Sequence, residues 1–177
     1  NKMGDHEGAI AIADKTLDII PGNPNALIVR GYALHDLKRY DEALASYNEV
    51  LRDEPNNTNA LNGVGGVLTE MGSHKEALGR FEAASKSNPR NLEALNNRSI
   101  ALYNLGRYPE AAEMAGRVLA INPDDRVARA NREALLGRQD GIRAGRETAG
   151  KVTPKLKARR PATPSKLDVY DEFQGRI

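Results

Sequence analysis

The feature that most constrains this chain is a proline that recurs every 34 residues. The four prolines are Pro21, Pro55, Pro89 and Pro123. Proline lacks the amide N–H that an α-helix uses, and it disfavours helix in the residue before it, so each proline is expected to end a helix. Three equal intervals indicate a repeated unit whose copies stack to share one core.

Each unit is predicted to hold two helices. The second helix has one face made of three positions. They are a small residue, the residue four positions later, and the residue three positions after that. These positions hold Ala9, Ala43, Ala77 and Ala111, then Ala13, Tyr47, Phe81 and Ala115, then Thr16, Val50, Ala84 and Val118. A first helix precedes it, with Leu27, Leu61 and Leu95 at one shared offset. Small residues at another offset, Gly31, Gly65 and Ser99, let the two helices approach closely.

A helical hairpin of 34 residues resembles the tetratricopeptide repeat (TPR) family. The match is carried by the small position, the turn tyrosines Tyr40 and Tyr108, the second-helix alanine, the aromatics Tyr47 and Phe81, and the final proline. Leucine replaces the family's first-helix Trp. Ala115 departs further, because a methyl group stands where an aromatic ring normally fills the hairpin, so this unit is predicted to be the looser one. The resemblance implies an all-α, right-handed solenoid of antiparallel helix pairs.

The repeat register divides the chain into a solenoid at residues 1–138 and a tail at 139–177. Within the solenoid, 8–23 is the second helix of a truncated repeat, 24–57, 58–91 and 92–125 are complete repeats, and 126–138 is a capping helix. The register predicts seven helices, with three complete hairpins flanked by a lone helix on each side. The unpaired first segment is expected to leave Ile10, Ile12 and Leu17 partly uncovered. Arg129, Arg132 and Glu133 should give the cap a polar outer face.

The tail is predicted to be a basic flexible arm. Residues 139–177 carry nine Lys and Arg against five Asp and Glu, in a chain of formal net charge +2. The run from 143 to 166 could meet phosphates, but it lacks the interleaved aromatics that stack on bases. We therefore prefer a solvated linker to nucleic-acid binding. Farther on, Leu167, Tyr170 and Phe173 recur every three residues, which fits a short docking helix over 165–173.

Catalytic chemistry is not indicated. The absence of cysteine excludes thiolate metal sites, iron–sulfur clusters and cysteine nucleophiles. His6 and His74 share the offset of Tyr40 and Tyr108, so they are interpreted as turn residues packing between hairpins. The glycines of residues 63–66 lie in a helical pattern and do not form a phosphate loop. We predict no enzyme, cofactor or metal site. With no apolar run of about 20 residues and no signal-like start, no membrane span and a cytoplasmic location are expected.

The TPR resemblance implies a concave groove lined by positions 2, 5, 6, 9, 12 and 13 of each unit, counted from Pro24, Thr58, Leu92 and Arg126. Asparagine is concentrated there. A carboxamide can bind both the N–H and the C=O of an extended peptide. The predicted peptide-binding residues are Asn62, Asn96, Asn97, Asn131, Tyr32 and Tyr103.

Asn97 and Asn131 share one offset in successive helices, which resembles the asparagine ladder of peptide-binding TPR proteins, and both are expected to be exposed. The alternative is that these asparagines are merely tolerated on a solvated face, or cap helices as Asn25 and Asn59 could. The Lys and Arg residues with which some TPR domains clamp a chaperone's C-terminal carboxylate are missing from the matching positions. Only Asn97 agrees with that clamp.

Three interpretations of function remain open. The preferred one is a non-enzymatic scaffold that binds a peptide segment of a partner protein in the groove. The alternative is a regulatory or targeting module of a larger catalytic protein, with the tail as tether. Nucleic-acid binding through the tail is the weakest. Self-association through the unpaired first helix or through the tail is compatible with the first two.

Overall fold

A computed structural model describes the backbone of residues 2–143 and the side chains of residues 5–137. This part of the chain is all-α. Its eight helices are α1 (Lys2–Ile19), α2 (Pro24–Asp36), α3 (Tyr40–Asp53), α4 (Thr58–Glu70), α5 (His74–Ser87), α6 (Leu92–Asn104), α7 (Tyr108–Ile121) and α8 (Arg126–Arg143). The expected total of seven was wrong, because three hairpins and two flanking helices make eight. The tail from residue 144 onward, including the predicted docking helix at 165–173, lies outside the described residues.

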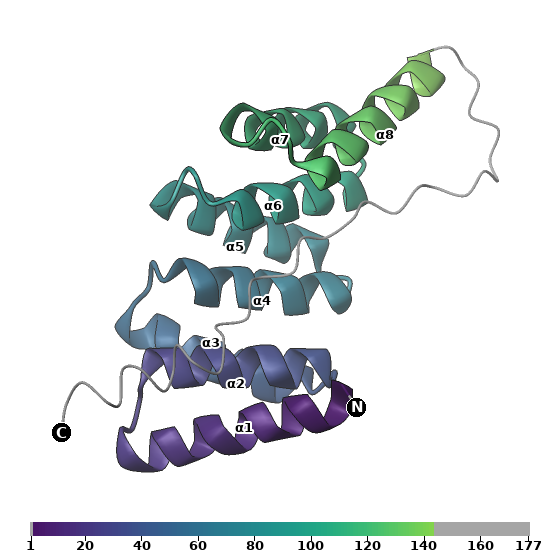
Figure 1. The fold of residues 1–177 in the computed structure, drawn as a ribbon. Coiled ribbons are helices and arrows are strands. Elements are labelled where there is room, and N and C mark those ends of the chain that lie inside the picture. Colours follow the sequence, from purple (N-terminus) through teal and green to yellow (C-terminus); the bar gives the residue numbers. More distant parts are fainter. Residues whose placement is uncertain (1, 144–177) are drawn as a thin grey trace.

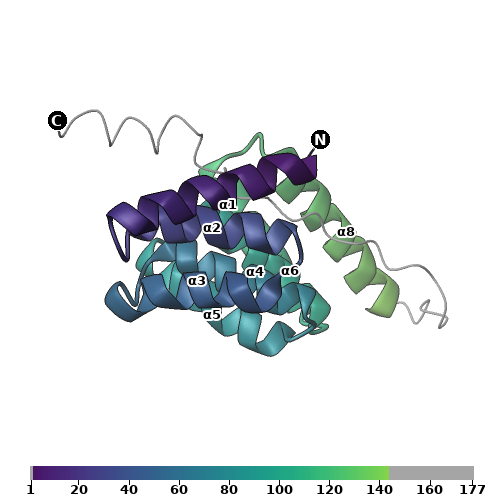
Figure 2. The same cartoon turned by 90° about the horizontal axis from the view of Figure 1, so that it is seen from below.

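The helices stack in chain order into a solenoid (Figure 1). Each helix packs against the next, so the pairs α2/α3, α4/α5 and α6/α7 are the hairpins expected from the repeat. Viewed along the stack, α1 lies over α2 at one end, and α8 extends beyond the pairs at the other (Figure 2). The all-α solenoid predicted from the proline period is confirmed.

First helices lie on the inner side of this stack. Besides their partners within the hairpins, α2 contacts α4, and α4 contacts α6. The second helices α3, α5 and α7 make no comparable contacts with one another in the described chain. Elements that touch across two steps of a curved stack lie on its concave side, so the first helices line the hollow.

Asparagine residues begin the first helices, but not the asparagines expected. Side-chain oxygens of Asn23, Asn57 and Asn91 accept from the amides three residues later at 3.0, 3.0 and 2.8 Å. Each satisfies an amide that the first helical turn leaves unpaired. Asn25 and Asn59, offered as alternative caps, lie inside α2 and α4 instead. The true caps share the 34-residue spacing, so the sequence already contained their signal.

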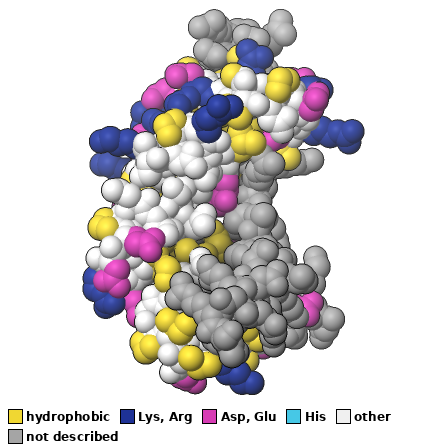
Figure 3. All heavy atoms as spheres, turned by 60° about the vertical axis from the view of Figure 1, so that its left-hand side comes forward, with side chains coloured by type: hydrophobic (Ala, Val, Ile, Leu, Met, Phe, Trp, Pro, Cys, Tyr) yellow, Lys and Arg dark blue, Asp and Glu magenta, His cyan; other side chains and the backbone are white. Residues whose placement is uncertain are grey.

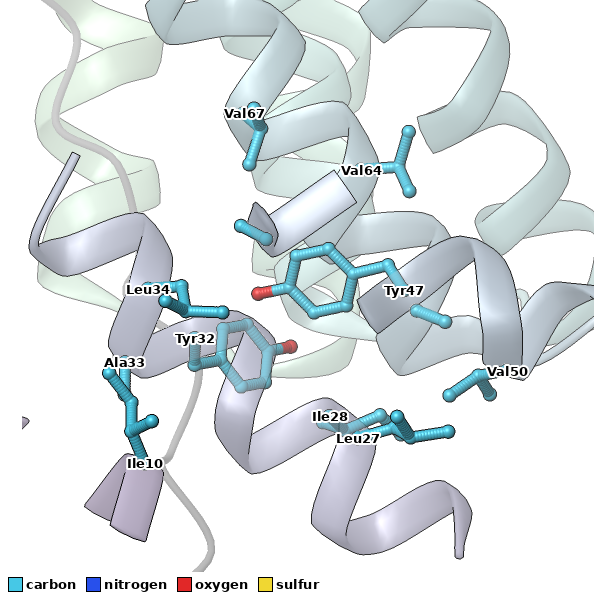
Figure 4. Packing of buried hydrophobic residues seen from close by; sticks show 12 residues of the cluster. Ile10, Leu27, Ile28, Tyr32, Ala33, Leu34, Tyr47, Val50, Val64 and Val67 are labelled. Carbon is cyan, nitrogen blue, oxygen red and sulfur yellow. The ribbon is translucent and has the colours of Figure 1, made fainter. Parts of the chain in front are cut away.

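Aromatic rings fill the first two complete hairpins. Tyr47 is buried among apolar residues of α2 and α4, with its ring edge-on to Tyr32 (Figure 4). A methyl group added at Gly31 would lie 2.5 Å from the Tyr47 ring, and one at Gly63 would also collide with it. Phe81 stands in the same relation to Gly65, again at 2.5 Å. These glycines therefore provide the space that the rings occupy.

The third hairpin solves the same packing problem differently. Ser99 takes the place of the glycine and Ala115 that of the ring, and both are fully buried. The Ser99 hydroxyl donates to the Ala111 carbonyl at 2.7 Å, which ties α6 to α7 across the hairpin. A larger residue on one helix thus accompanies a smaller one on the other. That this unit is the looser one stays a prediction.

Helix α1 covers its apolar residues better than expected. It begins at Lys2, ahead of the predicted start at residue 8. Ile10 is buried, Leu17 packs on the same cluster as Leu27 and Ile28, and Ile12 is half-buried. Ala9 and Ala13 explain this, since their small side chains let α1 settle on α2. The expectation that these residues stay partly uncovered was wrong for Ile10, which is buried, whereas Ile12 and Leu17 are partly uncovered as expected. Exposed apolar surface lies instead at the helix end, where Ile19 is 65% exposed.

The last helix has the polar outer face that a terminal helix requires. Arg129, Arg132 and Glu133 are all exposed, as predicted, while Ala128 and Leu135 are buried against α7. Asp125 caps α8, accepting from the Ala128 amide at 3.0 Å. The helix continues to Arg143, beyond the expected end at residue 138. No proline stands between residues 124 and 153 to stop it.

The ring-and-glycine contact can be tested at Phe81. Phe81→Ala should lower the free energy of unfolding by about 3–5 kcal/mol, because the side chain is 2% exposed. Gly65→Ala alone should also destabilise, despite its better helix propensity, because the new methyl meets the ring. In the double variant that methyl enters the space left by the ring. Chemical denaturation should therefore show a combined loss smaller than the sum, and simple additivity would contradict direct contact.

Candidate functional site

The first helices form a continuous surface, which we call the first-helix face. We define it by the groove-facing positions of α2, α4, α6 and α8. Contacts between these helices place the positions side by side. The Tyr32 hydroxyl donates to the Asn59 carbonyl at 3.4 Å, and the space beside Gly66 is bounded by His35, 3.3 Å from where a Cβ would stand. Farther along, the Asn131 carboxamide meets that of Asn96.

Asn131 and Asn96 form a buried pair. Asn131 Nδ2 donates to Asn96 Oδ1 at 3.3 Å, linking α8 to α6, and the two residues are 3% and 2% exposed. The sequence expectation paired Asn131 with Asn97 by offset and held both to be exposed. The shared offset stands in the sequence, but the expected exposure was wrong for Asn131, which is 3% exposed and donates to Asn96. Its inward orientation follows from the docking of α8 on the stack, which repeat spacing does not specify.

Asn62 is the polar residue of this face whose setting is least explained by the fold. It lies in α4, 34 residues before Asn96, and is 2% exposed. Neither its side-chain nitrogen nor its oxygen has a hydrogen-bond partner among the described residues. A buried polar group left unpaired costs about 1–3 kcal/mol. Asn62 therefore lowers the free energy of unfolding relative to an apolar residue at this buried position.

The other predicted residues lie higher on the face. Asn97 and Tyr103 are half-buried on α6. The Tyr103 ring packs against Tyr108 at the start of α7, with ring centroids 5.5 Å apart. Tyr32 is buried on α2 beside Tyr47, with centroids 5.6 Å apart. The six predicted residues thus all lie on first helices, four of them buried and Asn97 and Tyr103 half-buried.

Acidic charge reaches the buried tyrosines. Burial, and secondly the charge of Glu93, raise the pKa of Tyr32 well above its ordinary value. Burial likewise raises the pKa of Tyr47, with Tyr32, Asp36 and Glu93 adding to the shift. Glu93 belongs to α6 and Tyr32 to α2, so the charge of one first helix acts on the phenol of another. The Tyr47 hydroxyl also lacks a hydrogen-bond partner within the described chain.

Cations of the first helices turn away from this face. Arg30 Nε lies 2.8 Å from Asp14 of α1, and Arg98 Nη2 lies 3.0 Å from Glu82 of α5. These are equivalent pairs two repeats apart, each joining a first helix to the second helix of the preceding unit. Arg30 and Arg98 are the only Lys or Arg residues in α2, α4 and α6. The pairs were not foreseen, although their recurrence was visible in the sequence.

The histidines lie between neighbouring units, as predicted. His6 Nε2 is 3.7 Å from Asp36 Oδ2, and His74 Nδ1 is 3.5 Å from Asn104 Nδ2. Both contacts join a second helix to the end of the next first helix. His6 lies inside α1 rather than at a turn, because that helix begins at Lys2.

Among the described residues, no group of three or more His, Asp or Glu side chains is arranged to hold a metal ion. Nor does any helix in that part of the chain combine the length and apolarity needed to cross a bilayer.

Comparison with known proteins identifies the family. The family model described as "Psidin, N-terminal TPR repeats region" matches residues 2–128. The chain therefore belongs to the tetratricopeptide repeat family, as its 34-residue period had indicated. Family and fold together support a protein-interaction module. Comparison with curated proteins gave no significant match.

Solved structures share the fold at low sequence identity. MamA 41-end from Desulfovibrio magneticus RS-1 is 22% identical, with a TM-score of 0.69 over 80% of each chain. The Sgt2 TPR domain from Aspergillus fumigatus is 18% identical, with a TM-score of 0.67 over 79% of this chain and 92% of its own. The first TPR of Spaghetti (RPAP3), solved bound to the HSP90 peptide SRMEEVD, is 20% identical, with a TM-score of 0.64 over 66% and 95%.

The two offset-related asparagines should behave differently. Asn131→Ala removes the buried hydrogen bond from Asn131 to Asn96, so the free energy of unfolding should fall by about 1 kcal/mol or more. Asn97→Ala, at a half-buried position on α6, should change it by less than about 0.5 kcal/mol. Urea denaturation of both variants measures this. Equal losses would show that the Asn96–Asn131 bond does not stabilise the cap.

Alkaline pH should destabilise the chain through its buried phenols. An unfolded tyrosine loses its proton near pH 10, whereas burial keeps Tyr32 and Tyr47 protonated in the folded state. The unfolded state then binds fewer protons, so stability is retained below pH 10 and falls above it. Each phenol should contribute about 1.4 kcal/mol per pH unit. Tyr47→Phe should remove one contribution from the slope, and an unchanged slope would contradict this assignment.

Proposed function

We propose that the chain is a non-enzymatic scaffold whose first-helix face binds an extended peptide segment of a partner protein. Carboxamides of the face would pair with the peptide backbone, and the half-buried Asn97 and Tyr103 would contact its side chains. Backbone pairing of this kind gives affinity without requiring a particular sequence. We include a cytoplasmic location in this proposal.

The unpaired carboxamide of Asn62 is the observation that carries the proposal. In a family whose members bury apolar residues between helices, an amide with no partner on the inner face is a stability loss without a structural return. A peptide backbone offers one acceptor and one donor per residue, which matches the two ends of this side chain. Asn62, Asn96 and Asn131 follow one another across α4, α6 and α8, so a bound strand crossing the helices would pass all three.

The solved relatives support peptide binding as the function. The charges of this chain favour a ligand that differs from the peptide of RPAP3. RPAP3 was solved with an acidic peptide on its TPR. Here the positions of the carboxylate clamp hold no Lys or Arg, and the first-helix arginines are engaged between hairpins. An acidic peptide tail would therefore find no fixed cations on this face. The proposal accordingly does not extend to chaperone tails.

Asn62→Leu tests the proposal by separating stability from binding. Leucine removes the unpaired buried amide, so the free energy of unfolding should rise by about 1–3 kcal/mol. A peptide selected from a random library against the full chain serves as the probe, and its affinity should fall about tenfold, the loss of one or two backbone hydrogen bonds. Asn48→Leu, at an exposed position on the second helix α3, is the matched control.

Two results would overturn the proposal. One is that a library of extended peptides yields no binder competing at the first-helix face. The other is that Asn62→Leu and Asn48→Leu leave affinity for the selected peptide equally unchanged in calorimetry. A stabilised Asn62→Leu variant with reduced affinity would support it, since mere damage to the fold would lower both quantities together.

A further inference from the structure

The first-helix face is acidic. Its groove-facing positions from residue 25 to residue 134 carry Asp36, Glu70 and Glu93 and no Lys or Arg, and Arg138, at the last such position of α8, follows the described side chains. Glu93 of α6 contributes, after burial, to the raised pKa of the Tyr32 phenol on α2. Asp36 Oδ2 lies 3.7 Å from His6 Nε2 at the end of α2. In the middle of Figure 3 the described surface shows mostly uncharged polar side chains and backbone with scattered acidic groups, and Lys and Arg lie toward its ends and edge.

Such a face favours a cationic ligand. Asparagine side chains can pair with an extended backbone of any sequence, and the carboxylates then select among sequences by charge. A basic segment gains attraction to Asp36, Glu70 and Glu93, whereas an acidic one is repelled. The ligand chemistry that this surface recognises is therefore an extended polybasic peptide.

This chain itself carries such a segment just after α8. Residues 151–166 contain Lys151, Lys155, Lys157, Arg159, Arg160 and Lys166 and no acidic residue. Pro154, Pro161 and Pro164 are spaced through the same stretch. Proline disfavours helix in itself and in the residue before it, so this sequence favours the extended conformation that backbone recognition requires.

The tether has the length to bring this segment to the face. Asn131 precedes Arg143 by twelve residues of α8, which is about 18 Å at 1.5 Å per residue. Residues 144–150 can span up to about 25 Å when extended, enough to return to Asn131. The sixteen residues that follow can extend over about 50 Å. The three steps from α8 to α2 need about 30 Å at a typical helix separation of 8–10 Å.

We propose that residues 151–166 bind the first-helix face of their own chain as an internal basic ligand, held against Asp36, Glu70 and Glu93. This inference rests on the proposed function, because it assumes a face that accepts extended peptides. Tethering raises the effective concentration of the segment into the millimolar range, so weak contacts suffice. A partner peptide must then displace the segment, and partners more basic than it are favoured.

A single spin label provides the test. The chain has no cysteine, so Ala158→Cys places one label within the basic segment of the full-length protein. Amide signals of the first-helix face, such as those of Asn62 and Asn97, should be lost by paramagnetic broadening. Signals from second-helix residues, such as Glu113, should remain. Raising the ionic strength from about 0.1 M to about 1 M shortens the screening length from about 10 Å to about 3 Å and should restore the lost signals.

Matched charge variants identify the contact. Asp36→Asn, Glu70→Gln and Glu93→Gln together should abolish the broadening. Glu49→Gln, Glu76→Gln and Glu113→Gln make the same charge change on the second helices and should leave it intact. A second sample distinguishes contact within one chain from contact between chains. It mixes equal amounts of spin-labelled chain without isotope enrichment and isotope-enriched chain without the spin label. Contact within one chain leaves the signals of the enriched chain unbroadened, whereas contact between chains broadens them. Thermal unfolding by circular dichroism verifies that both variants fold.

The outcomes are decisive in each direction. Broadening confined to the first-helix face, insensitive to protein concentration and lost in the face variant alone, supports the internal ligand. No broadening of that face, broadening of a different surface, or broadening that arises only between chains overturns it. If Leu167, Tyr170 and Phe173 hold the tail instead, replacing them by serine removes the broadening while the acidic variants do not. The proposed function has its own readout at Asn62, so either idea can fail without the other.

Discussion

The contact between an aromatic ring and a glycine determines the geometry of this solenoid. Tyr47 fills the space beside Gly31 in its own hairpin and beside Gly63 in the next, so one ring joins three helices. Without a Cβ at either position, α2 and α4 can approach a ring that a larger residue would exclude. Phe81 repeats the contact with Gly65. Since α2, α4 and α6 touch along the inner side, the first-helix face exists because these rings and glycines fit one another.

That close approach also sets the chemistry of the face. A helix packed tightly on both sides buries whatever stands at its inner positions, so Asn62 and Asn96 reach 2% exposure although they belong to a surface predicted to bind ligand. Asn96 recovers part of the cost through Asn131 of α8. Asn62 has no such neighbour on α2, where the equivalent position is Ile28. Under the proposed function, Asn62 therefore lowers stability while it serves recognition, a trade-off that is common where polar groups serve binding.

The sequence predicted local structure well and buried polar contacts poorly, for a physical reason. Helix ends depend on proline, capping residues and periodicity, all of which lie within a few positions of each other in the chain. Ile10 and Asn131 depend on how a terminal helix settles against its neighbour, and the repeat does not constrain a helix that lacks one. Ala13 in place of a ring was the available signal that α1 would settle closely. The hydrogen bond between Asn96 and Asn131 had no equivalent in earlier units from which to infer it.

Charge placement follows from the same stacking. A first helix has one side toward its own hairpin, one toward the preceding unit and one toward the hollow, and Arg30 and Arg98 point to the preceding unit, where Asp14 and Glu82 receive them. These pairs are partly exposed, so their contribution to stability is small. Their larger consequence is electrostatic. Because Arg30 and Arg98 lie between hairpins, the groove-facing positions of α2, α4 and α6 carry acidic residues and no Lys or Arg, and this distribution of charge is what the proposed binding of the basic segment depends on.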